Sequence, residues 1–298
     1  MTNKDITKIY FCGDEITALY QGSTLIFKKS SGGGSTTEPT GVYKIKGTVT
    51  KGSGYTQFNL TYNNGQRVNV KVNKDLTFET DLQEPLTNAN AMFQGRSYLE
   101  TLDLNGLDTS QVTNMSNMFS QSNYLKDIKL SNFDTSKVTD MSLMLNGCLN
   151  LKSLDVSNFD TSKVINMRGM FANCSELKSL DVSNFDTSKV TNIADMFYGC
   201  GMLSDLYLNF DVSQSNSIDF SFGLCHLLTN VVGKFDNCSN NLWFTDAPLT
   251  AASAMVFING LATVTEKRTL ALSRTTYDSL TKEQIAIATS KGWTVTRK

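Results

Sequence analysis

The sequence predicts an α/β repeat solenoid, and two observations support that prediction. First, apolar residues recur at intervals of 26 positions, a spacing typical of repeat architectures. The recurring positions are Leu102, Ile128, Leu154, Leu180 and Leu206. Second, each interval combines a strand-like and a helix-like hydrophobic period. Stacking such units would bury a continuous core that no single unit could bury alone.

Each repeat shows the same two-part pattern. In "LKSLDVSNF", Leu154 and Val156 alternate with polar residues, which predicts a short strand with one buried face. Val138, Met141 and Met144 then follow at i, i+3 and i+6, which predicts a short helix. We therefore expect parallel strands on one side of the array and helices on the other, the arrangement of a leucine-rich repeat.

The regions on either side of the array have other patterns. The duplication of "ITKIYFCGD" in "ITALYQGST" predicts a small antiparallel β unit, and "SSGGGSTTEPTG" has the composition of a flexible linker. Alternation on both sides of Asn64-Gly65 predicts a β-hairpin that covers the first open edge of the array. The predicted domains are 1–29 (N-terminal β anchor), 30–41 (linker), 42–75 (β-hairpin cap), 76–242 (solenoid) and 243–298 (C-terminal α/β cap).

Helix signals characterise the C-terminal segment. Thr281 to Gln284 form a capping box and Gly292 is placed as the C-cap, which predicts a helix between them. A second helix is expected over 251–258, behind Thr250. The stretches "RTLALS" and "GWTVTR" predict strands.

Composition excludes some classes of partner. Lys and Arg number 27 against 28 Asp and Glu, which argues against nucleic acid and anionic membranes as partners. No apolar run approaches the roughly 18–20 residues of a membrane span. The first residues lack the basic and apolar regions of a signal peptide, so export through such a signal is not expected.

Repeated polar residues are expected to build turns. Asp108, Asp134, Asp160 and Asp186, with Asp211 as a shifted member, precede the helix-like stripe, and we interpret them as turn and cap residues. A calcium ladder would need more oxygen ligands than the sequence offers. Cysteines at one repeat position (Cys148, Cys174, Cys200 and Cys225) are interpreted as small buried residues, with a disulfide between stacked neighbours left open as the alternative.

No constellation in the sequence points to catalysis. The Met and Phe stripe is expected to be core, and His226 is the only histidine, which makes it a poor catalytic or metal candidate. Neither a phosphate-binding loop nor a nucleophile elbow is present. We expect no enzyme activity, no metal and no cofactor.

Residues that differ between copies are the candidates for binding, although neutral drift is the alternative for each. The predicted binding surface comprises Lys129, Asp155, Asp181, Tyr207, Arg168 and Tyr198.

The segment "LDVSNFDTSKVTNIADMFYGCGML" resembles the BspA-like leucine-rich repeats of bacterial surface proteins. The C-terminal "PLTAASAMVFINGLATV" and "LTKEQIAIATSKGW" are similar to the terminus common to these proteins in gut bacteria and their phages. This resemblance implies a surface-exposed recognition or adhesion solenoid and assigns no site residues.

A second resemblance concerns the N-terminus. The stretch "ITKIYFCGDEITALYQGSTLIFKK" resembles the β anchors of virion proteins in phages of gut bacteria. It implies a virion-anchoring role for Ile6, Ile9, Tyr10, Ile16, Leu19, Tyr20, Leu25 and Ile26.

These features together favour a phage virion structural protein: a fibre, tail or capsid-decoration protein attached by its N-terminus. Its expected partners are other virion proteins and a host-surface glycan or protein, or mucus, and a homo-oligomer is left open. Its expected location is the virion. The alternatives are a BspA-like adhesin of the bacterial cell surface and, less favoured, a polysaccharide-degrading enzyme.

Overall fold

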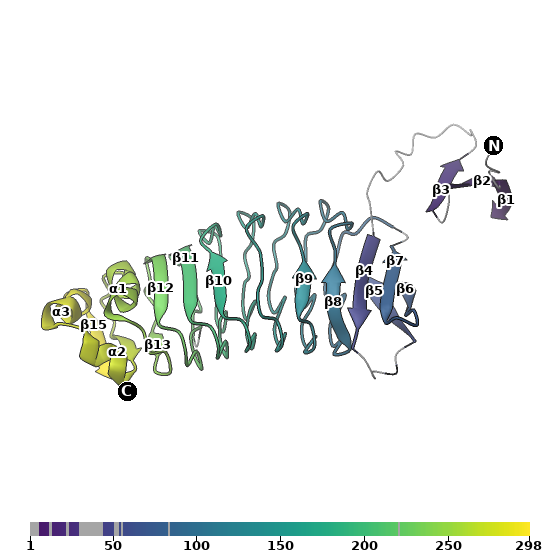
Figure 1. Ribbon diagram of the computed structural model, residues 1–298. Coiled ribbons are helices and arrows are strands. Elements are labelled where there is room, and N and C mark those ends of the chain that lie inside the picture. Colours follow the sequence, from purple (N-terminus) through teal and green to yellow (C-terminus); the bar gives the residue numbers. More distant parts are fainter. Residues whose placement is uncertain are drawn as a thin grey trace. The chain divides into compact units, whose positions relative to one another are not determined.

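A computed structural model describes residues 6–11, 14–21, 24–29, 44–50, 54, 56–82, 84–219 and 221–298. The chain divides into two compact units, Met1–Thr40 and Gly41–Lys298. In the first unit, β1 (Ile6–Phe11), β2 (Asp14–Gln21) and β3 (Thr24–Lys29) form an antiparallel sheet in that order (Figure 1). This pairing confirms the antiparallel β prediction for the N-terminal segment, while its role as an anchor stays a prediction.

The described residues of the second unit form four further sheets and three helices. The first sheet has the order β7-β4-β8-β9, formed by β4 (Lys44–Val49), β7 (Thr77–Asp81), β8 (Leu99–Asp103) and β9 (Asp127–Lys129). A hairpin joins β5 (Gln57–Tyr62) and β6 (Gln66–Lys71). A parallel sheet follows, formed by β10 (Ser179–Val182), β11 (Asp205–Asp211) and β12 (Asn230–Asp236).

The C-terminal part contributes the last sheet and the helices. Strands β13 (Leu242–Phe244), β14 (Arg268–Leu272) and β15 (Trp293–Arg297) pair in parallel. The helices are α1 (Ala251–Gly260), α2 (Arg274–Ser279) and α3 (Lys282–Ser290). In the part of the chain that the structure describes, no helix is both long enough and apolar enough for a membrane span.

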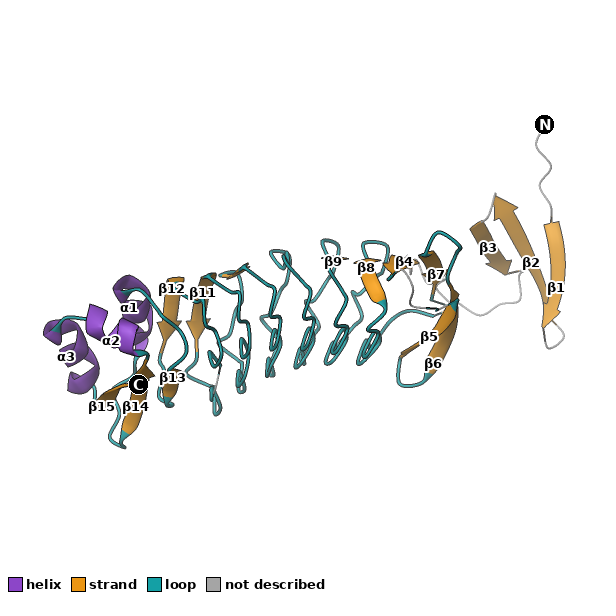
Figure 2. Ribbon diagram, turned by 60° about the horizontal axis from the view of Figure 1, so that its bottom comes forward, coloured by secondary structure: helices purple, strands orange, loops and turns teal. Residues whose placement is uncertain are grey.

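The predicted fold class, an α/β repeat solenoid of the leucine-rich-repeat type, is wrong. Among the described residues, helices occur only after Thr250 and are absent from the repeats (Figure 2). No strand is assigned at 151–156, where the sequence predicts one, and Leu154 there is only half-buried. The described chain is a mixed assembly of small sheets with few helices.

Left-handed backbone positions explain why the repeats contain no helix. Two positions in each repeat have positive φ, which a right-handed helix does not accommodate. The first position is occupied by Ala91, Asn117, Leu143, Gly169 and Asp195, and the second by Gly95, Gln121, Gly147, Asn173 and Gly199. The helix-like stripe is therefore a run of tight turns whose apolar spacing imitates a helix.

Backbone N–H groups in these turns bond to the next repeat. The N–H of Phe119 donates to the carbonyl oxygen of Met144 at 2.8 Å, and the N–H of Leu145 donates to that of Met170 at 2.9 Å. A helix would direct the same groups to residues four positions back in its own chain segment. The backbone N–H groups of one repeat thus find hydrogen-bond acceptors in the next repeat, and neighbouring repeats lie side by side (Figure 1).

Buried threonines add a second set of bonds between repeats. The hydroxyl of Thr135 donates to the carbonyl oxygen of Asp160 in the following repeat at 2.9 Å, and Thr161 bonds Asp186 in the same way at 3.0 Å. Both side chains are almost fully buried, and a buried hydroxyl without a partner would destabilise the fold. The sequence "FDTS", which occurs at 133–136, 159–162 and 185–188, therefore supplies contacts between copies.

Aromatic rings of successive repeats stack on one another through the core. Phe159 stacks on Phe133 and on Phe185 with ring centroids 6.4 Å apart in both pairs. On the turn side, Phe197 stacks on Phe171 at 5.9 Å. These rings and the Met side chains are buried, which confirms the stripe as core packing.

The hairpin β5–β6 meets the first repeat through its turn. Asn63 and Asn64 have positive φ, as a tight hairpin turn requires. The N–H of Asn63 donates to the carbonyl oxygen of Asn88 at 2.9 Å, and its side-chain oxygen accepts from the N–H of Thr87 at 2.8 Å. The predicted hairpin is confirmed, and its turn occupies the place of a preceding repeat.

At the C-terminus, local sequence signals predict α1 and α3. Thr250 caps α1, and Thr281 with Gln284 forms the expected capping box of α3. Strands β14 and β15 lie where "RTLALS" and "GWTVTR" predict them. The short helix α2, capped by Ser273, and the strand β13 are not anticipated by the sequence analysis.

Candidate binding surface

Outward side chains of the first sheet form two rows across its four strands. The register pairs Thr48 of β4 with Thr77 of β7 and with Thr101 of β8, and Thr101 with Asp127 of β9. We call Thr77, Thr48, Thr101 and Asp127 the hydroxyl row. Two residues along each strand, on the same face, the register aligns a second set of side chains: Glu79, Lys46, Asp103 and Lys129. We call these four residues the charged row.

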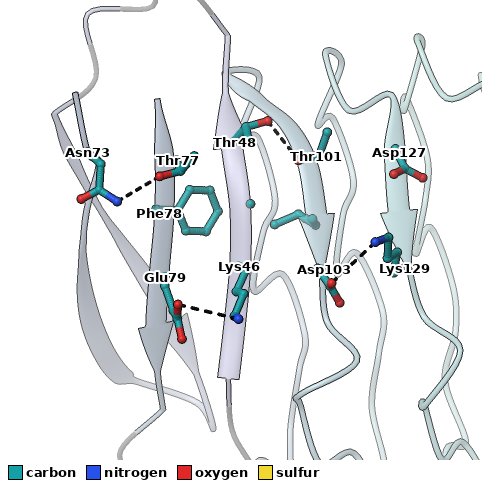
Figure 3. Close-up of a pocket in the computed structure, with 12 residues that line it drawn as sticks. Lys46, Thr48, Asn73, Thr77, Phe78, Glu79, Thr101, Asp103, Asp127 and Lys129 are labelled. Carbon is teal, nitrogen blue, oxygen red and sulfur yellow. Dashed lines mark hydrogen bonds and ion pairs between the residues drawn. The ribbon is translucent and has the colours of Figure 1, made fainter. Parts of the chain in front are cut away.

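Charges alternate in sign along the charged row. The Nζ atom of Lys46 lies 3.8 Å from Oε2 of Glu79, and Nζ of Lys129 lies 3.8 Å from Oδ2 of Asp103. In the hydroxyl row, the Oγ1 atoms of Thr48 and Thr101 are 2.9 Å apart (Figure 3). Opposite charges on neighbouring strands attract, so the arrangement is favourable without any ligand.

A hollow of about 380 Å³ opens over these two rows, and Asn73, Gly47, Phe78 and Leu102 also line it. The carboxylate of Asp127 makes no hydrogen bond or ion pair with another described residue, and it lies beside Thr101 at one end of the hydroxyl row (Figure 3). A Cβ atom on Gly47 would lie 2.3 Å from the Thr101 carbonyl oxygen. Gly47 therefore allows the close approach of β4 and β8 beneath the hollow.

Positions equivalent to both rows recur on the second parallel sheet, beyond residues 151–156, which form no strand. Strand register aligns Ser179 with Asp205 in the hydroxyl row, and Asp181 with Tyr207 and Val232 in the charged row. Tyr207 is 38% exposed, which is unusual for so large an aromatic side chain on a sheet. The strand side of the repeats thus presents an extended polar surface with an aromatic group at its far end.

The predicted binding residues divide into two groups. Lys129, Asp181 and Tyr207 belong to the charged row, and Asp155 has the equivalent place in the repeat between them. Asp155 is exposed, lies outside any strand and accepts a hydrogen bond from the N–H of Ser157 at 3.0 Å.

Arg168 and Tyr198 lie on the turn side of their repeats, apart from the two rows. Arg168 is exposed, and its Nη2 lies 3.1 Å from Oδ2 of Asp195 in the next repeat. Tyr198 is half-buried. The structure therefore does not bring these two residues together with the strand-side group.

The predicted virion-anchoring residues all belong to β1, β2 and β3. Only their backbone is described, so the anchoring contacts lie outside the described part of the structure.

Sequence reasoning missed Lys46, Thr48, Glu79 and Thr101 as members of this surface. Lys46 and Thr48 alternate with the buried Ile45 and Val49, and this alternation was the available signal for an outward face. It does not reveal which distant strands pair with β4, and the hollow depends on that pairing.

Residues 62–154 and 121–235 match a family described as "Mycoplasma protein of unknown function, DUF285". Together these segments cover more than half of the chain. The chain belongs to this family. No curated protein and no solved structure matches the chain. In this DUF285 protein, the matched region contains β8, β9, β10 and β11, and so most of the two rows.

The aspartates of the DUF285 repeats form turns. Oδ1 of Asp160 accepts from the N–H of Ser162 at 2.9 Å, and Asp134 and Asp186 repeat this contact with Ser136 and Ser188. The predicted turn role is confirmed, but the predicted helix cap is wrong because no helix follows. Among the described residues, no cluster of three or more His, Cys, Asp and Glu could hold a metal ion.

These turns predict a dependence of stability on acid pH. In Asp134, Asp160 and Asp186 the hydroxyl and then the N–H of the following serine lower the carboxyl pKa below its ordinary 3.8. The resulting stabilisation is complete above that pH and is lost as the pH falls through the native pKa values. We expect the triple Asp→Asn variant, which keeps the acceptor oxygen, to show a smaller drop in urea midpoint between pH 6 and pH 2.5 than the parent protein. An equal drop would contradict this origin, and the triple Ala variant, which lacks the acceptor, should be less stable at both pH values.

The cysteines of the repeats are buried and reduced. The Sγ atoms of Cys148, Cys174 and Cys200 lie 3.1–3.4 Å from carbonyl oxygens of the preceding repeat, where Ser122 makes the same contact in an earlier copy. All five described cysteines are free thiols, which confirms the interpretation as small buried residues. Cys12 lies outside the described residues.

Burial makes these thiols unreactive. It raises the pKa of Cys148 to about 12, and the pKa of Cys174 and Cys200 also lies well above the ordinary 9.0. We expect no alkylation of these cysteines by iodoacetamide at pH 8.5 in the native protein, and complete alkylation in urea, measured peptide by peptide by mass spectrometry. Because the native state favours the neutral thiol, stability should decline as the pH rises above about 9. Native-state modification of Cys174 at a rate similar to that in urea would contradict the packing.

His226 is exposed and belongs to no metal-binding group in the described part of the chain.

Proposed function

We propose that this chain is a non-enzymatic binding protein of a phage virion, a fibre, tail or capsid-decoration protein, whose repeats adhere to the host surface or to mucus. The observation that carries the proposal is the strand-side surface. It places a hollow and two rows of mostly polar side chains on a frame in which neighbouring repeats bond to one another through buried contacts.

The division between frame and surface supports a binding role. Frame positions repeat the same residues, such as Thr135 and Thr161 or Phe133 and Phe159, because each must match its neighbour. Positions of the charged row carry Asp, Lys and Tyr side chains in different repeats. Exposed side chains can change without disturbing the frame, so this surface is free to be adapted to a partner.

Two sequence resemblances support the location on a virion. The repeats resemble BspA-like surface proteins, and the N-terminal segment resembles virion anchors of gut-bacteria phages. The N-terminal segment also forms a compact unit of its own, as an attachment module would. Attachment through that unit would leave the repeats to contact the host.

Mass spectrometry of purified particles tests the location. We expect peptides of this chain in gradient-purified virions at a constant ratio to capsid protein. Its absence from particles, with recovery from the bacterial envelope instead, would favour a bacterial adhesin.

Binding of the full-length labelled protein to host cells and to mucin tests adhesion. We expect saturable binding that Tyr207→Ala weakens and Lys163→Gln, an exposed change in the aspartate turns, leaves unchanged. Unchanged binding by a panel of variants across both rows would contradict a role for the strand side.

A further inference from the structure

The hollow over the first sheet offers hydrogen-bond donors and acceptors in alternation. Along the charged row, Glu79 and Asp103 accept and Lys46 and Lys129 donate. Along the hydroxyl row, Thr48 and Thr101 bond each other, which leaves one hydroxyl hydrogen of the pair to donate to a ligand. The Thr77 hydroxyl already donates to Asp75, so Thr77 and Asp127 can only accept. A ligand group that both donates and accepts matches this pattern best, and a hydroxyl group is such a group.

Charge disfavours anionic ligands in the hollow. The two lysines balance Glu79 and Asp103 at short range, which leaves Asp127 as the carboxylate without a partner among the described residues. An anionic ligand would be repelled by Asp127 and by the aspartates farther along the rows. A cationic peptide would be attracted by Asp127 but would also meet the ammonium groups of Lys46 and Lys129 on the same face. A neutral, hydroxyl-rich ligand meets neither obstacle.

The shape of the surface fits a chain rather than a single small molecule. Residues at equivalent positions recur on the second parallel sheet, where Ser179 aligns with Asp205 and Asp181 with Tyr207 on strands spaced by about 4.8 Å. The exposed ring of Tyr207 offers an apolar face to a sugar ring.

From these observations we propose that the hollow binds a neutral oligosaccharide, with Asp127 and Lys46 contacting its hydroxyl groups and the rest of the chain lying along the two rows. This inference rests on the proposed adhesive function and names its ligand class.

Binding to a glycan array tests the class. The probes are full-length protein against neutral hexose and N-acetylhexosamine oligosaccharides, their sialylated and sulfated counterparts, and an oligolysine peptide. We expect binding to neutral glycans that is nearly independent of salt between 50 and 500 mM, because no net charge is neutralised. Preference for the acidic glycans or for oligolysine would overturn the assignment.

Calorimetry with one neutral glycan from the array then locates the site. Asp127→Ala and Lys46→Met should each weaken binding about tenfold, as expected for loss of a hydrogen bond to a charged group. The matched controls Asp219→Ala and Lys163→Met change exposed residues outside the two rows and should leave affinity unchanged. An unchanged thermal midpoint in all four variants shows that folding is intact, and equal affinity in all four would overturn the assignment.

The two proposals fail separately. Adhesion to host cells that neutral oligosaccharides do not compete would contradict the ligand class and leave the adhesive function standing. Glycan binding at the hollow by a protein absent from virions would contradict the location and leave the ligand class standing.

Discussion

Phe222→Ala should lower the free energy of unfolding by about 3–5 kcal/mol, the usual loss when a buried phenylalanine is truncated to alanine. Phe222 is 1% exposed and lies between the repeats and the C-terminal sheet. Its ring centroid is 5.5 Å from that of Phe197, 4.8 Å from Phe244 and 5.2 Å from Phe257. Truncation would therefore remove contacts to a repeat, to β13 and to α1 at once.

Chemical denaturation followed by circular dichroism measures this loss. Phe222→Leu keeps most of the buried volume and should lose clearly less stability than the alanine variant. Leu227→Ala is the surface control, since Leu227 is 46% exposed in the same repeat, and should stay within about 0.5 kcal/mol of the parent. A loss below about 1 kcal/mol for Phe222→Ala would show that this cluster does not hold the two regions together.

Gly233→Ala should separate β11 from β12 locally. Gly233 has a φ of +123°, and a Cβ atom there would lie 1.7 Å from the carbonyl oxygen of Leu208 on the paired strand. Neither backbone can yield without breaking ladder hydrogen bonds, each worth about 1 kcal/mol, and the positive φ adds strain of about 1–3 kcal/mol. We expect a total loss of at least about 3 kcal/mol.

Gly201→Ala is the matched control for this substitution. Gly201 has no heavy atom within 4 Å of an added Cβ and no positive φ, so its replacement should change stability by less than about 0.5 kcal/mol. Hydrogen exchange locates the effect: amides of β11 and β12 should lose protection in Gly233→Ala. Retained protection with full stability would mean that the strands are not paired as described.

Much of the local structure follows from local sequence. The capping box at Thr281, the N-cap at Thr250 and the hairpin at Asn64-Gly65 each act within a few residues, so their patterns can be interpreted without knowing the rest of the fold. The aspartate turns at Asp134 and its equivalents are equally local. Such features involve contacts between near neighbours, so their prediction was correct, except that the helix cap expected of the aspartates was wrong because no helix follows them.

The helix prediction failed because apolar spacing does not determine the sign of φ. Val138, Met141 and Met144 are all buried, as expected, but Leu143 between them is left-handed. Gly147 and Gly169 at the two positive-φ positions were the available signal for turns in place of a helix.

The sequence alone was enough to predict the 26-residue period of the repeats and the burial of their Met, Phe and Cys side chains. It also shows which positions differ between copies. The left-handed turns and the hollow over Lys46, Thr48 and Thr101 could be known only from the folded chain. Both depend on bonds between residues far apart in the chain: N–H groups of one repeat with carbonyls of the next, and β4 with β7 and β8. A residue's own neighbours specify how its side chain is buried, but not which distant strand its backbone will meet.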